Sequence, residues 1–343
     1  MPRLRLTRRQ FLRLAVLGGL GVAAAAFERV SRPVGAGNYV RWVVRGQGQR
    51  LAGRPAAVGL GQCASYGDDL RGCLRELWRL AALPDVAGKR VLVKPNLIDV
   101  IEGNPTTTSH AVMAAVLDLL TELGAGEIVV GEGTGFRREA WPIVESCGLA
   151  AVLAARKTPF VDLNYDDPQP APVRDGWFRH TNAIWLPRHV REAQVIVSVP
   201  KLKTNHWAGV SLSLKNLFGI VPGCRYGWPK NMLHVNGITP SILGLYQMVR
   251  PMVGIVDGIV GMEGDGPLFG AGVPHGVLAA GADPVALDST CARLMGFDPQ
   301  KVGYLWLAGW AGIGQVARIE TRGGSVEQLQ RRYQAPPGIT LGG

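Results

Sequence analysis

The chain has 343 residues, of which 47% are hydrophobic and 18% charged, a balance typical of a globular protein with a sizeable core. Its formal net charge is +11, but five arginines lie within the first 26 residues, where no acidic residue occurs. The rest of the chain has 32 basic and 26 acidic residues, a net charge of +6, and no dense basic tract interleaved with aromatic residues. This distribution argues against binding to nucleic acid.

The N-terminus has the features of an export signal. Residues 7–13 read TRRQFLR, and an apolar run rich in Gly and Ala follows from Leu14 to Phe27. This arrangement resembles a twin-arginine signal, so residues 1–27 are predicted to direct the chain to the twin-arginine (Tat) export machinery. The expected location is the periplasm or the extracytoplasmic face of the membrane. A disordered basic arm and a permanent anchor are the alternatives, although fourteen mildly apolar residues are short for a membrane span.

The cysteines indicate no metal cluster. Their spacing contains no CxxC pair, so neither a zinc ribbon nor an iron–sulfur cluster motif is present in this chain. Outside the cytoplasm a disulfide between Cys63 and Cys73 is an option, and isolated buried thiols are the favoured state. The five cysteines are Cys63, Cys73, Cys147, Cys224 and Cys291.

After the signal, residues 28–54 lack periodicity and are predicted as a linker with room for a short strand from Val40 to Val44. Residues 55–322 then alternate strands and helices, and residues 323–343 form a C-terminal tail. Strands are expected over 56–60, 90–93, 127–130, 160–163, 183–186, 195–199, 252–256, 276–280 and 316–319. Helices are expected to begin at Asp68 or Asp69 and at Asp283, and to cover 110–123, 141–153, 210–219, 241–249 and 299–310. Such alternation predicts an α/β fold, a mostly parallel sheet flanked by helices with Rossmann-like layering.

The stretch from Val195 to Gly223 is the most informative for function. An apolar strand breaks at Pro200 into the polar segment KLKTNH, and the helix-like run that follows carries Lys215 and Asn216 among leucines. A buried strand of this kind delivers polar groups to a sheet edge, which predicts a site for an anionic or carbonyl-bearing ligand. The alternative is that these lysines are ordinary surface cations whose stems lie on apolar neighbours.

Several predicted strands end at an ionisable residue, and parallel strands would bring these residues together beyond their carboxyl ends. Lysines there can neutralise a phosphate or carboxylate, and a desolvated lysine can act as a base or form a Schiff base. Carboxylates supply the oxygens that hold divalent cations, and histidines can add nitrogen ligands or a general base. The strand-end residues are Lys94, Glu132, Lys201, Asp257 and Asp283.

These considerations give three sets of candidate site residues. Catalysis is assigned to Lys201, Lys203 and His206. The predicted ligand-binding residues are Lys94, Asn96, Thr106, Lys215, Asn216 and His234. A possible divalent metal is assigned to Asp257, Glu263, Asp265 and Asp283, and no GxSxG, HExxH or EF-hand motif specifies the reaction.

Six motifs occur in the order seen in the DUF362 family, and the chain resembles this family from about residue 56 to residue 314. The family is named for a domain of unknown function, so the resemblance implies kinship without a reaction. Some members carry ferredoxin-type cysteine motifs, which this sequence lacks. Many relatives place a histidine directly after the KLKT segment, whereas Asn205 precedes His206 here, which weakens the assignment of His206. The motifs are VKPN (93–96), SVPKLKT (198–204), LKNLFG (214–219), VDG (256–258), MEGDGP (262–267) and DPVALD (283–288).

The favoured hypothesis is an exported enzyme that acts, with a bound metal, on a small anionic substrate in a crevice at the carboxyl ends of the strands. The alternative is a non-catalytic accessory protein that binds a redox partner or cofactor through an exposed apolar patch near Trp228, or near Trp306 and Trp310. A third interpretation assigns the charged motifs to a buried ion-pair network. The general arrangement is also similar to that of nickel-dependent lactate racemase, a likeness that supplies no function.

Overall fold

The structure is a computed structural model that describes residue 7 and residues 36–178, 181–249 and 251–342. The predicted signal, residues 1–27, lies outside the described residues except for Thr7. Among the helices in the described ranges, none combines the length and the apolar character needed to cross a membrane.

A single mixed sheet forms the centre of the described chain, and it contains ten strands. Eight of them lie in the order β12-β1-β11-β10-β7-β2-β3-β4, while β8 pairs with β10 and with β9. Most neighbours are parallel, but β11 runs antiparallel to both β1 and β10, and β9 runs antiparallel to β8. The strands are β1 (Ala56–Gln62), β2 (Arg90–Pro95), β3 (Glu127–Glu132), β4 (Phe160–Asp162), β7 (Val195–Val199), β8 (Lys201–Asn205), β9 (Gly209–Ser211), β10 (Met252–Glu263), β11 (Ala271–Gly281) and β12 (Ile319–Arg322).

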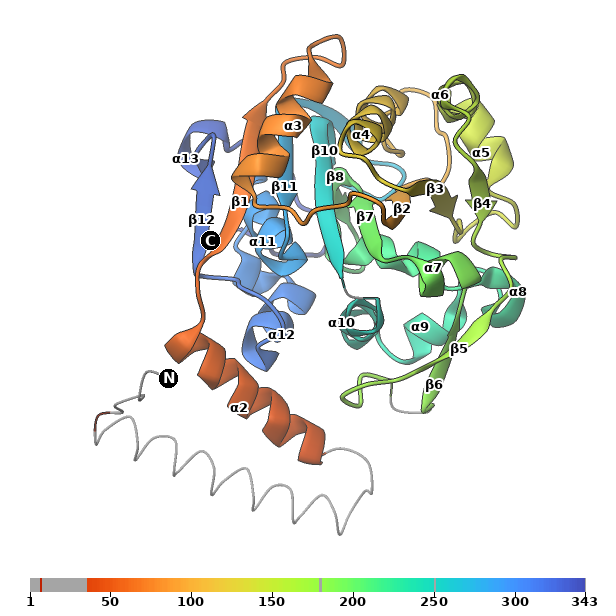
Figure 1. Ribbon diagram of the computed structural model, residues 1–343. Helices are drawn as coiled ribbons and strands as arrows, with labels where there is room; N and C mark the ends of the chain where they lie inside the picture. The colour runs from red at the N-terminus through yellow and green to blue at the C-terminus, as the bar shows by residue number, and fades with distance from the viewer. Residues whose placement is uncertain (1–6, 8–35, 179–180, 250, 343) are drawn as a thin grey trace.

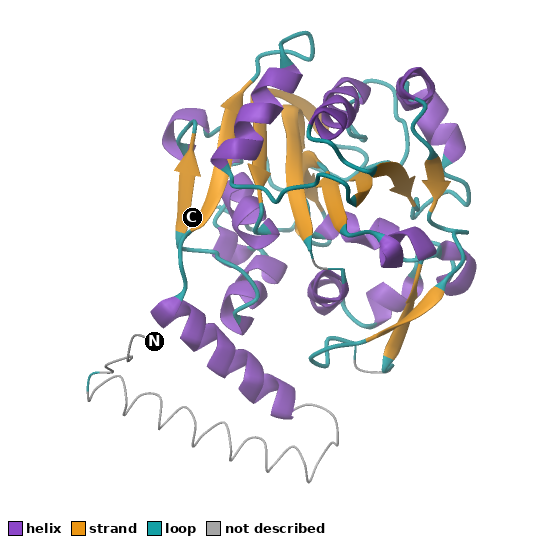
Figure 2. Ribbon diagram, in the orientation of Figure 1, coloured by secondary structure: helices purple, strands orange, loops and turns teal. Residues whose placement is uncertain are grey.

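Helices cover both faces of this sheet, as Figures 1 and 2 show. One apolar core lies between the sheet and α3 (Leu70–Leu80), α4 (His110–Glu122), α5 (Trp141–Ser146) and α6 (Leu149–Arg156). A second, larger core lies on the opposite face, against α10 (Ile238–Met248), α11 (Pro284–Leu294) and α12 (Gly303–Ala311). The α/β fold with a mostly parallel sheet flanked by helices is therefore confirmed.

Shorter elements complete the described chain. A hairpin of β5 (Gln169–Pro172) and β6 (Ala183–Leu186) forms a separate two-stranded sheet on the same side of the main sheet as α10 (Figure 1), and its buried residues join the larger core. The remaining elements are α7 (Arg188–Glu192), the 3₁₀ helix η1 (Lys215–Ile220), α8 (Gly223–Tyr226), α9 (Asn231–Val235), the 3₁₀ helix η2 (Pro299–Lys301) and α13 (Val326–Leu329).

The short strand expected from Val40 to Val44 is wrong, because these residues lie in helix α2 (Ala36–Ala52). Contacts distant in the chain hold this helix in place: the Trp42 ring stacks on Trp177 with centroids 4.0 Å apart, and Arg45 Nε donates to Ala311 O at 2.8 Å. Tertiary packing therefore stabilises α2, a helix that the sequence pattern of this segment does not predict.

Four other expectations are corrected. The helix predicted over 141–153 breaks at Gly148, whose φ of 77° is a left-handed conformation that glycine adopts readily. The run expected to be helical over 210–219 divides into β9 and the 3₁₀ helix η1. Strand β10 does not stop at Asp257 but continues to Glu263, because it pairs with β11 along most of its length. Tyr333 and Leu341, in the predicted tail, are buried in the larger core.

Candidate functional site

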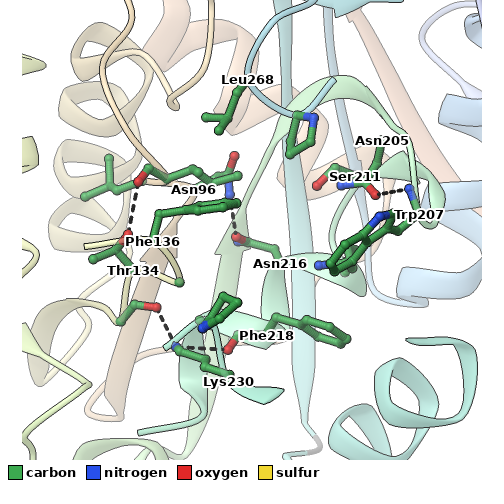
Figure 3. Close-up of a pocket in the computed structure, with 18 of the residues that line it drawn as sticks. Asn96, Thr134, Phe136, Asn205, Trp207, Ser211, Asn216, Phe218, Lys230 and Leu268 are labelled. Carbon is green, nitrogen blue, oxygen red and sulfur yellow. Dashed lines mark hydrogen bonds between the residues drawn. The ribbon is translucent and has the colours of Figure 1, made fainter. Parts of the chain in front are cut away.

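A cavity of about 270 Å³ opens at the carboxyl ends of β2 and β3 (Figure 3). Its walls come from the loops after these strands, from η1, and from the segments that follow β8 and β10. Parallel strands β2 and β3 explain the location, because their carboxyl ends meet at one edge of the sheet. The polar and charged residues of the lining are Lys94, Asn96, Glu132, Thr134, Asn205, His206, Ser211, Lys215, Asn216, Lys230 and His234.

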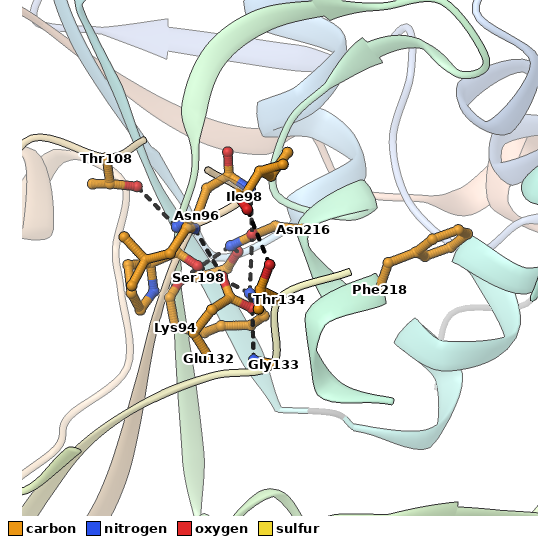
Figure 4. Close-up of polar contacts among 12 residues, drawn as sticks. Lys94, Asn96, Ile98, Thr108, Glu132, Gly133, Thr134, Ser198, Asn216 and Phe218 are labelled. Atoms are coloured by element: carbon orange, nitrogen blue, oxygen red, sulfur yellow. Dashed lines mark hydrogen bonds and ion pairs between the residues drawn. The ribbon is translucent and has the colours of Figure 1, made fainter. Parts of the chain in front are cut away.

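A buried ion pair lies in the lining of the cavity, and Figure 4 draws its polar contacts. Lys94 Nζ, at the end of β2, lies 2.7 Å from Glu132 Oε1, at the end of β3, and the two side chains are 0% and 3% exposed. The other Glu132 oxygen accepts a hydrogen bond from Leu97 N at 2.9 Å. Burial lowers the pKa of Lys94, while the charge of Glu132 opposes that shift. The opposite charges of Lys94 and Glu132 nearly cancel, so a net charge in the pocket comes from other side chains.

Amide side chains tie this ion pair to η1. Asn216 Oδ1 accepts from Lys94 Nζ at 3.1 Å, and Asn216 Nδ2 donates to Lys94 O and to Ser198 Oγ, both at 3.0 Å. Asn96 Nδ2 also points toward Asn216 Oδ1, at 3.4 Å (Figure 4). The Asn96 Oδ1 atom is buried and has no hydrogen-bond partner in the described chain. An unpartnered acceptor in a cavity wall is suited to a donor group on a ligand.

Lys215 is a cation of the cavity lining that no described residue neutralises. Its Nζ has no acceptor within hydrogen-bond distance among the described residues, and it lies 3.7 Å from the centroid of the Phe218 ring. Burial, followed by the charge of Lys94, lowers the pKa of Lys215 to about 7. Near neutral pH the Lys215 amine therefore populates both its charged and its neutral form.

A third lysine of the lining, Lys230, is not among the residues predicted from the sequence. Its Nζ donates to Gly133 O at 2.6 Å and to Phe218 O at 3.1 Å, so it clamps the loop after β3 against η1 (Figure 3). Burial lowers its pKa to about 7. The residue lies in an irregular loop with a φ of 67°, which no periodic pattern could indicate. The sequence does mark this segment as an aromatic and basic loop, which contains Tyr226, Trp228 and His234.

Apolar and aromatic side chains surround the mouth of the cavity. Phe136, Trp207 and Phe269 line it although they are 57%, 58% and 70% exposed. The Trp207 ring meets the His234 ring edge to face, with centroids 4.5 Å apart, and Phe218 continues this wall toward Lys215. The pocket thus combines a polar floor with an apolar entrance, as small-molecule sites commonly do.

His206 is at the rim. Its Nδ1 is 2.9 Å from Gly266 O and 3.8 Å from a carboxylate oxygen of Asp265, and its ring meets Trp207 edge to face. The side chain is 42% exposed, so its ring can reach both the solvent and a bound ligand.

Lys201 lies outside the lining of this cavity, in a second buried ion pair. Its Nζ is 2.6 Å from Asp257 Oδ2 and 2.9 Å from Tyr66 Oη, and Asp257 Oδ2 also accepts from Ser109 N at 2.9 Å. Strands β8 and β10 are parallel and align Lys201 with Asp257, which explains the pairing. These contacts join the two strands to the start of α4.

Lys203 and Thr106 are likewise separate from the cavity lining. Lys203 is fully buried and donates to Thr106 O at 2.8 Å, and Thr106 Oγ1 donates to Asp99 O at 2.6 Å. Burial lowers the pKa of Lys203 well below its ordinary value, and the neighbouring charges of Lys201 and Lys215 act in the same direction. Both side chains hold the loop after β2 in place.

The structure does not bring the four predicted metal carboxylates together. Asp257 is paired with Lys201, Glu263 accepts from Gln334 N at 2.8 Å, and Asp283 caps α11 and accepts from Gln315 N at 2.9 Å. Asp283 follows β11, whose antiparallel direction puts it at the opposite edge of the sheet from the cavity. In the described ranges no group of three or more His, Cys, Asp or Glu side chains is placed to hold a metal ion. The donor set therefore does not fit the divalent metal expected from the sequence.

The tryptophans expected to mark an exposed patch differ in their exposure to solvent. Trp306 is 49% exposed and stacks on Trp310 with centroids 6.4 Å apart. Trp228 is half-buried beneath the guanidinium of Arg138, 5.9 Å from its ring centroid.

The family model for the domain of unknown function DUF362 matches residues 91–293, which is more than half of the chain. The protein belongs to the DUF362 family. The matched range includes both buried ion pairs and every polar residue of the cavity lining. This DUF362 protein is 31% identical over 218 residues to the thylakoid-associated protein sll1697 of Synechocystis, an alignment that covers 63% of this chain and 65% of that protein. The chain thus matches less than two thirds of that relative's own length.

Two solved structures are similar to this DUF362 chain. The lactate racemase apoprotein of Thermoanaerobacterium thermosaccharolyticum gives a TM-score of 0.42 at 13% identity, over 71% of this chain and 57% of that one. A structural-genomics protein from Thermotoga maritima gives a TM-score of 0.40 at 14% identity, over 63% of this chain and 55% of that one.

Proposed function

We propose that the cavity binds a small organic anion that has an apolar or aromatic body. The observation that carries the proposal is Lys215, a cation without a hydrogen-bonded acceptor in the described chain that projects into an apolar wall. An anion would supply the missing acceptor, and its binding would favour the charged form of the amine.

The dimensions and the composition of the pocket define the ligand further. A volume of about 270 Å³ suits a small molecule, and the rings of Phe136, Trp207 and Phe269 offer apolar surface at the entrance. Asn96 Oδ1 offers an acceptor for a hydroxyl, amine or protonated group of the ligand. We therefore place the acidic group near Lys215 and the apolar body toward the mouth.

The proposal is tested by thermal stabilisation with carboxylates and phosphates of graded apolar size. We expect phenylacetate and phenyl phosphate to raise the melting temperature of the full chain more than acetate and inorganic phosphate do. The Lys215→Met variant should lose this stabilisation. Lys157→Met is the matched control, because Lys157 is exposed at the end of α6 and its loss removes the same charge outside the pocket. Equal stabilisation of the wild type and Lys215→Met, or none in the wild type, overturns the proposal.

We also propose that the protein works outside the cytoplasm after export by the twin-arginine machinery. The support is the TRRQFLR segment and the apolar run that follows it, both in the sequence.

A further inference from the structure

The amine of Lys215 lies in the corner of the pocket around Phe218. Lys215 Nζ lies 3.7 Å from the centroid of the Phe218 ring, and the His234 ring meets the same ring edge to face at 6.2 Å. No carboxylate pairs with this amine in the described chain, whereas Lys94 and Lys201 each have one. Lys203 and Lys230 also lack a carboxylate, but their nitrogens donate to backbone oxygens. Among the described lysines of this region, Lys215 is thus the one whose nitrogen is free to react.

We propose that Lys215 is a nucleophilic amine that condenses with the carbonyl carbon of an aldehyde or 2-oxo acid bound in the cavity. This inference rests on the proposed function, because it assigns a reactive carbonyl to the same small organic anion.

The chemistry needs only groups that the pocket and the solvent supply. The neutral Lys215 nitrogen attacks the carbonyl carbon, a C–N bond forms, and one proton passes from this nitrogen to the carbonyl oxygen to give a carbinolamine. A second proton on that oxygen allows it to leave as water, and the product is a protonated imine. The balance is one amine, one carbonyl and one proton giving one iminium and one water. His234, on the same wall, and Lys230 are the neighbouring proton carriers.

The protonation state of Lys215 makes it a better nucleophile than an exposed lysine. Because burial lowers its pKa to about 7, about half of the Lys215 side chains are neutral at pH 7, against roughly one in three thousand for an ordinary lysine. Lys230 has a similar pKa, but its Nζ is held by the carbonyl oxygens of Gly133 and Phe218. Geometry therefore distinguishes the two amines where charge does not.

The test is chemical trapping in the full chain. The protein is incubated at pH 7 with pyruvate, phenylpyruvate or benzaldehyde, reduced with borohydride to convert an imine into a stable secondary amine, and mapped by peptide mass spectrometry. We expect an adduct on Lys215 with at least one probe, and its loss in Lys215→Arg, which keeps the positive charge but cannot condense. The yield on Lys215 should rise with pH through about 7.

The control measurement separates this inference from anion binding. Phenylacetate is an anion with no carbonyl that condenses with an amine, so its stabilisation of the wild type measures anion binding alone. If phenylacetate stabilises the wild type but no probe modifies Lys215, the nucleophile assignment is overturned and the anion site stands. If neither stabilisation nor adduct is found, both proposals fail. Adducts on Lys230, or on the exposed Lys157 to the same extent as on Lys215, also overturn the assignment.

Discussion

Lys94 Nζ and Glu132 Oε1 lie 2.7 Å apart beneath the cavity, where both side chains are almost completely buried. Removing one member of a buried ion pair leaves the other charge uncompensated. We expect Glu132→Gln to lower the free energy of unfolding by about 3 kcal/mol, as measured by urea denaturation. The double variant Lys94→Met/Glu132→Gln should lose less than the sum of the two single variants. Additive losses would show that the two charges do not stabilise each other.

Gly219 is the close-contact position of the pocket. A Cβ on this residue would meet Glu132 Oε1 and would lie 2.6 Å from Lys94 Nζ. We therefore expect Gly219→Ala to destabilise the fold by about 1–3 kcal/mol and to weaken binding of phenylacetate. Gly135→Ala is the control, because Gly135 also lines the cavity but a Cβ there meets nothing within 4 Å. The two variants would behave alike only if the ion pair could move aside.

The lysine at position 215 should make stability depend on pH. Its pKa is about 7 in the folded chain against 10.5 for an ordinary lysine, so the unfolded chain binds more protons between these two values. The cost of burying the charge is complete below pH 7 and disappears as the pH rises toward 10.5. Relative to Lys215→Met, the wild type should therefore gain stability between pH 7 and pH 10. Urea denaturation across this range measures the difference, and a constant difference would contradict the shifted pKa.

Lys201 and Asp257 are expected to act on stability and not on ligand binding. Asp257 accepts from Lys201, Tyr66 and Ser109, so Asp257→Asn leaves the Lys201 charge buried and should cost about 3 kcal/mol. Below its melting temperature this variant should bind phenylacetate as the wild type does, because neither residue lines the cavity. Circular dichroism verifies that the Asp257→Asn protein is folded. Loss of binding in the folded variant would show that this ion pair contributes to the ligand site.

The paired arginines at 8 and 9 should govern location. Replacing both with lysine keeps the charge but removes the feature that resembles a twin-arginine signal. We expect the variant Arg8→Lys/Arg9→Lys to remain in the cytoplasmic fraction of a host with an intact Tat pathway, while the wild type is exported. Fractionation followed by immunoblotting measures this, with Arg41→Lys as a control outside the signal. Unchanged export of the double variant would exclude the twin-arginine route.

The sequence by itself determined many of the elements and their layering. Apolar runs such as Val195–Val199 and the capping residues Asp69 and Ser109 are local features, and the structure has the strand and both caps. The end of each parallel strand is also a local feature, so the meeting of Lys94 with Glu132 followed from the predicted parallel sheet.

Only the tertiary structure decided which charges share a site. The antiparallel direction of β11 moves Asp283 to the other edge of the sheet, and the extension of β10 turns Asp257 into a partner of Lys201. Lys230 reaches the pocket from an irregular loop. The aromatic residues at the entrance come from segments that are far apart in the sequence. Strand direction and the approach of loops depend on contacts across the whole chain, because local periodicity specifies an element but not its neighbours.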